Sequence, residues 1–242
     1  MVILLPPWEL AKFGALQLSW FGLDHRLFMT ESKHFERFNH DPDADGYDAD
    51  VKNEADPIRH GYEDVLNWVT ERAAIKPTDL VVDLGIGTGN LSARLPQAAG
   101  LIGVDVSERM LSIAREKLIG VDLLQEDLLA WSDGDEKIDV VVSTYAVHHL
   151  ESDEKEGLFK NLAARLNPQG RLVFGDLGFA DAAHRSECER SWKELGNTAM
   201  LEAISDEYFW DVDRARTVLE GLGLRVEIER LGALSWGVAA IR

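Results

Sequence analysis

Residues 80–90 of this 242-residue chain read LVVDLGIGTGN, and this stretch decides the fold. Its first five residues are almost wholly apolar without alternation, which is typical of a strand buried on both faces in a parallel sheet. Gly85, Gly87 and Gly89 follow at every second position. Glycine allows a sharp turn and lets a ligand approach the backbone without a Cβ atom in the way. The stretch therefore predicts a strand, a ligand-binding loop, and then a helix whose free N–H groups point at the ligand.

The alternation of strand and helix continues along the chain and predicts a mostly parallel α/β sheet with right-handed crossovers. Further strands are expected at 101–105, 121–125, 138–144, 170–176, 225–231 and 234–241. Helices are expected at 57–74, 108–118, 153–166 and 212–222, with one or two more within 182–204. Only Gly232 and Ala233 separate the last two strands. Because a parallel crossover needs a longer link, these strands must form an antiparallel hairpin.

The charge of the chain argues against a polyanionic partner. Asp and Glu number 43, Lys and Arg 25, and the formal net charge is −18 at pH 7. Such a surface repels phosphate groups, so neither nucleic acid nor an anionic membrane is an expected partner. No apolar run approaches the ~18 residues of a membrane helix. The single cysteine, Cys188, excludes an internal disulfide and fits a reducing, cytoplasmic location.

The chain divides into an N-terminal cap or extension at 1–56 and a main domain at 57–242. Residues 1–29 are the most apolar stretch. They predict either a helix that covers the core or a partner chain, which makes a homodimer plausible, or a segment ahead of a start at Met29.

The end of the cap is strongly acidic. Asp41, Asp43 and Asp45 match the first positions of a calcium loop, but Lys52 stands where such a loop needs a bidentate glutamate. A solvated acidic loop is therefore the expected structure of residues 41–56.

An aspartate stands at the end of each of three successive predicted strands: Asp83, Asp105 and Asp127. Ligands of open α/β sheets bind beyond these strand ends. Asp83 comes two positions before the glycines, where a carboxylate repels pyrophosphate and suits an ammonium or sulfonium group. Asp105 can accept hydrogen bonds from both ribose hydroxyls, and Asp127 can accept one from an adenine amino group. The alternatives are helix N-caps for Asp83 and Asp105 and a turn cap for Asp127.

With these residues the chain resembles the class I S-adenosylmethionine-dependent methyltransferases over about residues 47–242. Five segments are similar to the family's motifs: VVDLGIGTGN (81–90), GVDVSERML (103–111), QEDLL (125–129), IDVVVSTYAVHHL (138–150) and LNPQGRLVFGDL (166–177). The resemblance implies a Rossmann-like, mostly parallel seven-stranded sheet with an antiparallel C-terminal hairpin strand and an N-terminal helical cap. Within the family, the chain looks most like proteins that methylate small molecules.

The resemblance also implies a set of residues that bind S-adenosylmethionine. They are Tyr47, which covers the cofactor from the cap, Asp83, Gly85, Gly87 and Gly89 around the methionine part, Asp105 at the ribose, Val106 directly after it, Met110, Asp127 and Leu128 at the adenine, and Ser143 near the sulfonium. Met110 has the alternative of ordinary core packing, and Tyr47 that of a solvated loop residue.

Methyl transfer is an in-line displacement in which the cofactor brings the reactivity and the protein supplies alignment. A general base is needed only where the acceptor carries a proton. The catalytic candidates are Tyr145, His148 and His149, just after the fourth motif strand, although a histidine there can also simply cap or pack the next helix. Asp176, at the end of strand 170–176, is expected to face the same pocket.

No metal site is expected, because His184 and Cys188 have helical spacing but lack a third ligand. The expected activity is methyl transfer to a small-molecule acceptor, through an acceptor region at 1–56 and 177–211 that carries no readable signature. The acceptor atom stays open among O, N, S and C. The alternatives are a non-catalytic S-adenosylmethionine-binding protein and an NAD-dependent oxidoreductase, whose glycine spacing would differ.

Overall fold

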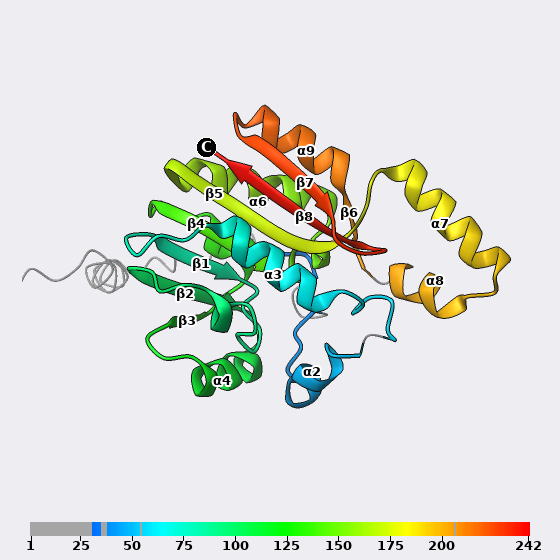
Figure 1. The fold of residues 1–242 in the computed structure, drawn as a ribbon, viewed down its shortest axis with the longest axis horizontal. Coiled ribbons are helices and arrows are strands. Elements are labelled where there is room, and N and C mark those ends of the chain that lie inside the picture. The colour runs from blue at the N-terminus through cyan, green and yellow to red at the C-terminus, as the bar shows by residue number, and fades with distance from the viewer. Residues whose placement is uncertain (1–30, 35–37, 54, 206) are drawn as a thin grey trace, which may run out of the picture. The chain divides into compact units, whose positions relative to one another are not determined.

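The strands form one twisted sheet, and Figure 1 labels the strands and the helices around it. The structure is a computed structural model that describes residues 31–34, 38–53, 55–205 and 207–242. The strands are β1 (Leu80–Leu84), β2 (Gly100–Asp105), β3 (Asp122–Gln125), β4 (Ile138–Thr144), β5 (Leu166–Phe179), β6 (Trp210–Asp211), β7 (Arg225–Arg230) and β8 (Ser235–Ile241). The expectations for residues 1–29 lie outside the described residues.

The strand order is β3-β2-β1-β4-β5-β8-β7, with the short β6 beside β5. The strands from β3 to β5 pair in parallel, and β8 runs antiparallel to both β5 and β7. The predicted fold class, with its antiparallel C-terminal hairpin strand, is confirmed. The hairpin link is longer than expected, because the paired strands leave residues 231–234 between them.

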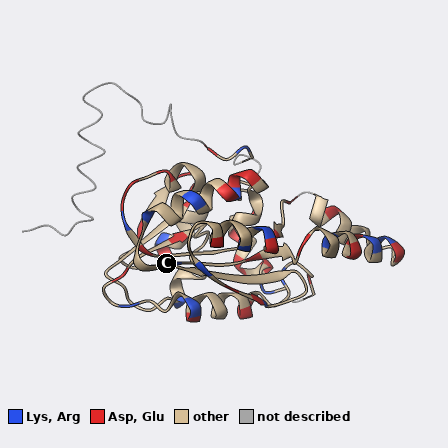
Figure 2. Cartoon of the chain, turned by 90° about the horizontal axis from the view of Figure 1, so that it is seen from above, with Lys and Arg blue, Asp and Glu red and all other residues tan. Residues whose placement is uncertain are grey.

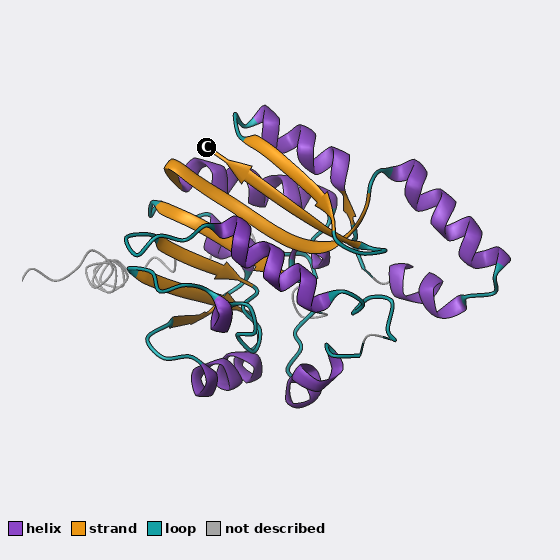
Figure 3. Cartoon of the chain, in the orientation of Figure 1, coloured by secondary structure: helices purple, strands orange, loops and turns teal. Residues whose placement is uncertain are grey.

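Helices lie on both faces of the sheet (Figure 3). They are α2 (Ala44–Asp50), α3 (Tyr62–Ala73), α4 (Glu108–Lys117), α5 (Leu128–Ser132), α6 (Ser152–Arg165), α7 (Ala182–Glu194), α8 (Thr198–Ser205) and α9 (Val212–Gly221). Alternate strand residues point to opposite faces. Val82 and Val141 therefore pack with residues of α5, α6 and α9, whereas Val81 and Val140 pack with α3. This double burial explains the unbroken apolar strands.

Several predicted boundaries were wrong. The glycine loop leads into a single 3₁₀ turn, Ser92–Arg94, and not into an α-helix. The helix expected from residue 57 begins at Tyr62, because Gly61 (φ 79°) turns the chain and the Asp56 carboxylate accepts the Ile58 N–H in a local turn. The strand predicted at 170–176 extends over Leu166–Phe179.

The segment between β5 and α9 forms an arm beside the sheet, made of α7 and α8 (Figures 1 and 3). The sequence left one or two helices open for residues 182–204, and the structure has two. The chain then returns through residues 207–209 to β6, which pairs with the end of β5. This return path brings Glu207 to the carboxyl edge of the sheet.

Candidate active site

A pocket lies at the carboxyl ends of β1, β2 and β4. The strand β1 stands between β2 and β4, so the chain leaves β1 for one side of the sheet and later returns to its other side. Ligands of open α/β sheets bind at such a switch in strand order. The predicted site residues that line the pocket are Tyr47, Gly85, Gly87, Asp105, Val106, Met110, Asp127, Leu128, Tyr145, His148 and His149.

Three predicted cofactor residues lie beneath the pocket and do not line it. The Asp83 side chain is fully buried, and its Oδ2 accepts the Ser92 hydroxyl at 2.6 Å. Ser143 Oγ donates to the carbonyl oxygen of Leu84 at 2.6 Å. Gly89 has a φ of 82°, and a Cβ atom there would lie 2.7 Å from a methyl carbon of Leu118. These residues support the glycine loop from below.

Asp105 holds the glycine loop against the end of β2. Its Oδ2 accepts the Gly87 N–H at 2.8 Å, and its Oδ1 accepts the Ser107 N–H at 2.9 Å. The N-cap of α4 is Ser107, so the alternative prediction of Asp105 as a helix N-cap was wrong. Burial raises the pKa of the Asp105 carboxyl. Met110 is both core and pocket wall, since it is 2% exposed and still lines the cavity.

Asp127 is committed to bonds within the chain. Its Oδ1 accepts the N–H groups of Leu129 and Ala130 at the start of α5, as the turn-cap alternative predicted. The backbone N–H and hydroxyl of Ser32 also donate to Asp127, at 3.1 and 2.5 Å. Among the described residues, Oδ2 accepts only the Ser32 hydroxyl, so an adenine amino group would share this oxygen with Ser32, a contact that no local sequence pattern indicates.

The acidic cap is docked on the glycine loop and α4. Asp48 accepts hydrogen bonds from Thr88 Oγ at 2.6 Å and from Asn90 Nδ2 at 2.9 Å. Asp41 accepts from Ser107 and Arg109, and Asp45 pairs with Arg109. The solvated loop expected over 41–56 was wrong, because Ala44–Asp50 is the helix α2. Asp41 and Asp45, two of the residues that match a calcium loop, instead bind Arg109 of α4.

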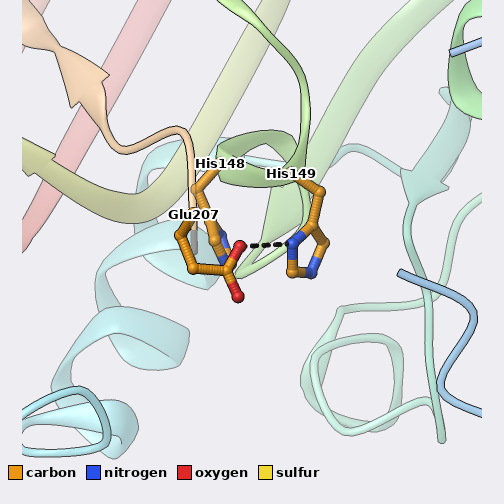
Figure 4. Close-up of side chains that lie close together, drawn as sticks. All are labelled: His148, His149 and Glu207. Atoms are coloured by element: carbon orange, nitrogen blue, oxygen red, sulfur yellow. Dashed lines mark hydrogen bonds and ion pairs between the residues drawn. The ribbon is translucent and has the colours of Figure 1, made fainter. Parts of the chain in front are cut away.

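Two histidines and two carboxylates meet at the end of β4. His148 Nδ1 lies 2.6 Å from Asp176 Oδ1, and His149 Nδ1 lies 2.9 Å from Glu207 Oε2 (Figure 4). Asp176 is 4% exposed and stands behind His148, so it does not face the pocket as expected. His40, from the cap, places its Nε2 3.4 Å from His149 Nε2. Burial lowers the pKa of His149 to about 4.

The third catalytic candidate, Tyr145, has a strained backbone. Its φ is 52°, a left-handed conformation that is rare for a residue with a large side chain. Its ring stacks on Tyr62 with centroids 5.2 Å apart. The turn carries the chain from β4 into the 3₁₀ turn Val147–His149 and aims Tyr145 and His148 at the same pocket.

Comparison with known proteins decides the family. Residues 81–170 match the family described as Methyltransferase domain. The chain is 31% identical over 203 residues to an uncharacterized methyltransferase from Oceanobacillus iheyensis, a match covering 83% of this chain and 91% of that protein. The chain belongs to the class I S-adenosylmethionine-dependent methyltransferases. The predicted enzyme class and the predicted cofactor, S-adenosylmethionine, are thereby confirmed.

Other relatives of this methyltransferase agree in sequence and in fold. It is 33% identical over 183 residues to an uncharacterized methyltransferase from Bacillus cereus, covering 75% of this chain and 84% of that one. Its fold is similar to the crystal structure of magnesium protoporphyrin IX methyltransferase from Synechocystis PCC 6803 with bound SAH, with a TM-score of 0.61 and 21% identity. That match covers 86% of this chain and 97% of the other.

The glycine loop of the methyltransferase fits a bound cofactor. Gly87 has a φ of 54°, and nothing lies within 4 Å of the position that its Cβ atom would take. The loop therefore leaves space over its backbone, with the Asp105 carboxylate directly beside it. Beneath the loop, Asp83 Oδ1 is buried without a hydrogen-bond partner among the described residues. An open cradle with acids beside and below it suits a cationic, ribose-bearing ligand.

Several pocket residues were missed by the sequence analysis. Ser32, Phe38, His40, Arg59 and Glu207 line the pocket together with the predicted residues. Four of the five come from the two regions, 1–56 and 177–211, that were named as the acceptor side without a readable motif, and Arg59 lies just after the first of these regions. Within the described residues, no helix is long and apolar enough to cross a membrane.

The buried carboxyl of Asp83 predicts a measurable pH dependence. Burial raises its pKa from 3.8 to about 7, and the nearby charge of Asp105 contributes. Between these values the folded chain binds a proton that the unfolded chain does not, so this group stabilises the fold at low pH and loses that effect as pH rises toward 7. The variant Asp83→Asn cannot titrate. We expect the free energy of unfolding of wild type minus that of the variant to fall from about pH 5 to about pH 7, by up to roughly tenfold in the equilibrium constant per pH unit.

Urea titrations of both proteins across this pH range measure that difference directly. Subtracting the variant removes the opposing contribution of buried neutral histidines such as His149, which is common to both proteins. Parallel stability curves for the two proteins would show that Asp83 stays ionised in the fold.

Proposed function

We propose that this methyltransferase transfers a methyl group to a small-molecule acceptor held between the glycine loop and the end of β4. One observation carries the proposal. The predicted cofactor residues Gly87 and Asp105 line the same pocket as the catalytic candidates Tyr145 and His148. Methyl transfer requires the donor carbon and the acceptor atom to be held in line at short distance. A shared pocket supports the proposal because both reactants can be held in it.

The cofactor half of the pocket is formed by β1, β2 and the start of α4. We propose that Gly85 and Gly87 let the backbone approach the cofactor, that Asp105 binds the ribose, and that Val106, Met110 and Leu128 pack on the adenine. Tyr47 lies across from them on α2, with the Arg59 guanidinium 5.5 Å from its ring centre. Bound S-adenosylmethionine supplies an electrophilic methyl group on its sulfonium.

The acceptor half is formed by segments far apart in the sequence. Tyr145, His148 and His149 come from the end of β4, His40 from the cap, and Glu207 from the return path after α8. We propose that these residues contact and orient the acceptor. Because cap residues cover this half, the space suits a small molecule better than a polymer.

The surface charge supports the same choice. The net charge of −18 opposes a nucleic-acid backbone. Figure 2 shows the Lys and Arg residues of the described chain scattered among Asp and Glu on the same elements. A cytoplasmic location and a homodimer stay predictions.

Two measurements test the proposal in sequence. Melting of the purified protein is first followed with S-adenosylmethionine, S-adenosylhomocysteine and NAD, since a ligand that binds only the folded state raises the melting temperature. Formation of S-adenosylhomocysteine is then measured with small thiols, phenols, amines and carboxylates, and with tRNA and DNA. We expect a shift with the two adenosyl-sulfur ligands and turnover with a small molecule. Turnover with nucleic acid alone would overturn the proposal, and binding without turnover would favour a non-catalytic protein.

A further inference from the structure

The cluster of His148, His149 and Glu207 has the composition and spacing of a metal site (Figure 4). One ligand atom from each residue lies within 4.8 Å of the other two. We propose that these three side chains bind a divalent transition-metal ion at the acceptor end of the pocket. Metal binding itself does not depend on methyl transfer, whereas the ion's role with the acceptor, given below, rests on the proposed function.

Two of the three distances between ligand atoms of the cluster are close to those that a bound ion requires. Tetrahedral ligands at ~2.1 Å from a metal lie ~3.4 Å from one another. His149 Nδ1 is 2.9 Å from Glu207 Oε2, and His148 Nε2 is 3.9 Å from the same oxygen. One distance is shorter and the other longer than the ideal by about half an ångström, so small side-chain rotations would form the site.

The hydrogen bond to Asp176 aims a lone pair of His148 at this position. Nδ1 lies 2.6 Å from Asp176 Oδ1 and therefore donates its proton to the carboxylate. In the neutral form of the ring the lone pair is on Nε2, which faces Glu207. A lone pair and a carboxylate that face each other attract a cation between them. Carboxylates behind metal-binding histidines have this orienting role in metal sites.

The other ligands are also held from behind. His40 Nε2 lies 3.4 Å from His149 Nε2, on the side of the ring away from Glu207. The Tyr208 N–H donates to the carbonyl oxygen of His148 at 3.0 Å, and Lys155 Nζ donates to the Tyr208 carbonyl at 2.6 Å. These bonds fix the residue next to Glu207 against the histidine turn. The three ligands are thus positioned by contacts that do not involve the ion.

The donor set selects the kind of metal. Two imidazole nitrogens and one carboxylate suit Zn²⁺, Fe²⁺, Co²⁺ or Ni²⁺, whereas Mg²⁺ and Ca²⁺ prefer oxygen ligands alone. Three protein ligands leave a coordination position open. Because His148, His149 and Glu207 all line the pocket, an acceptor hydroxyl or thiol can take that position. The ion would lower the pKa of the bound group, whose proton passes to water and leaves an anionic nucleophile for the methyl carbon.

The test uses the full chain after metal removal by a chelator. Zn²⁺ and Co²⁺ are titrated separately, with bound metal measured by elemental analysis and bound Co²⁺ by its visible ligand-field absorption. We expect one ion per chain. Glu207→Gln removes a ligand while keeping the side-chain shape, and Asp176→Asn removes the orienting carboxylate. Affinity should fall by about 10–100-fold in Asp176→Asn and by at least as much in Glu207→Gln.

The exposed His60 provides a matched control for adventitious binding, and His60→Gln should retain full affinity. If Glu207→Gln does not fold, as judged by circular dichroism, His149→Gln replaces it. A wild-type protein that binds neither ion, or equal affinities in wild type and Glu207→Gln, would overturn the inference. Methyl transfer that survives complete metal removal would overturn the ion's role in acceptor binding but leave the proposed function standing. If one ion binds but no acceptor is methylated, the metal site would stand and the proposed function would fail.

Discussion

Replacing Gly85 by alanine is expected to destabilise the protein by about 2–4 kcal/mol, through overpacking and a left-handed backbone. Gly85 has a φ of 71°, and an added Cβ atom would lie 2.2 Å from the Cβ of Ala146. The Gly85 N–H donates to the Val104 carbonyl at 2.8 Å, so the loop cannot retreat without losing that bond. The side chain of Ala146 is a single methyl group on the backbone, so no side-chain rotation can move it away. Urea unfolding of wild type and Gly85→Ala measures the loss.

Gly87→Ala is the matched control in the same loop. Gly87 also has a positive φ, 54°, but nothing lies within 4 Å of its Cβ position. Its cost is therefore only that of the backbone conformation, about 1–2 kcal/mol. The added methyl group would instead occupy the cradle and weaken cofactor binding. Equal stability losses in Gly85→Ala and Gly87→Ala would contradict the close packing of the β1 and β4 turns.

The fold could be predicted because its signals are local. Buried parallel strands need unbroken apolar runs, such as residues 138–144, and their alternation with helices leaves few topologies. The antiparallel hairpin of β7 and β8 was predicted from a link too short for a parallel crossover, although the link is longer than predicted. Predicted helix boundaries were wrong where a local hydrogen bond competed with the helix. The Asp56 carboxylate accepts the Ile58 N–H, and α3 therefore begins only at Tyr62.

The candidate site could be predicted only in part, for the same reason. Residues at the strand ends, such as Asp105 and His148, meet because the carboxyl ends of parallel strands share one edge. Ser32 and Glu207 reach that edge through contacts with residues 95 and 58 positions away. No periodicity or spacing encodes such contacts. The residues of the proposed metal site are likewise not indicated by local ligand spacing, because Glu207 lies 58 positions from His149.

Loss of the Asp105 carboxylate is expected to produce the largest change in cofactor affinity. Its two oxygens already accept the N–H groups of Gly87 and Ser107, and its remaining lone pairs are those we propose for the ribose hydroxyls. A hydrogen bond to a charged group contributes about 1.5–3 kcal/mol. In Asp105→Asn the amide must also turn its NH₂ group toward one of the two backbone donors. The affinity for S-adenosylhomocysteine should therefore fall by roughly 10–100-fold, measured by isothermal titration calorimetry.

Asp213→Asn, at an exposed position of α9, is the control for the loss of one negative charge. It should bind the ligand as wild type does. Melting curves separate the two consequences of Asp105→Asn, because a loosened glycine loop lowers the melting temperature without ligand, whereas a lost ribose contact lowers only the ligand-induced shift. If Asp105→Asn bound S-adenosylhomocysteine as tightly as Asp213→Asn, the ribose assignment would be wrong. Asp105 would then serve only to fasten the loop to the end of β2.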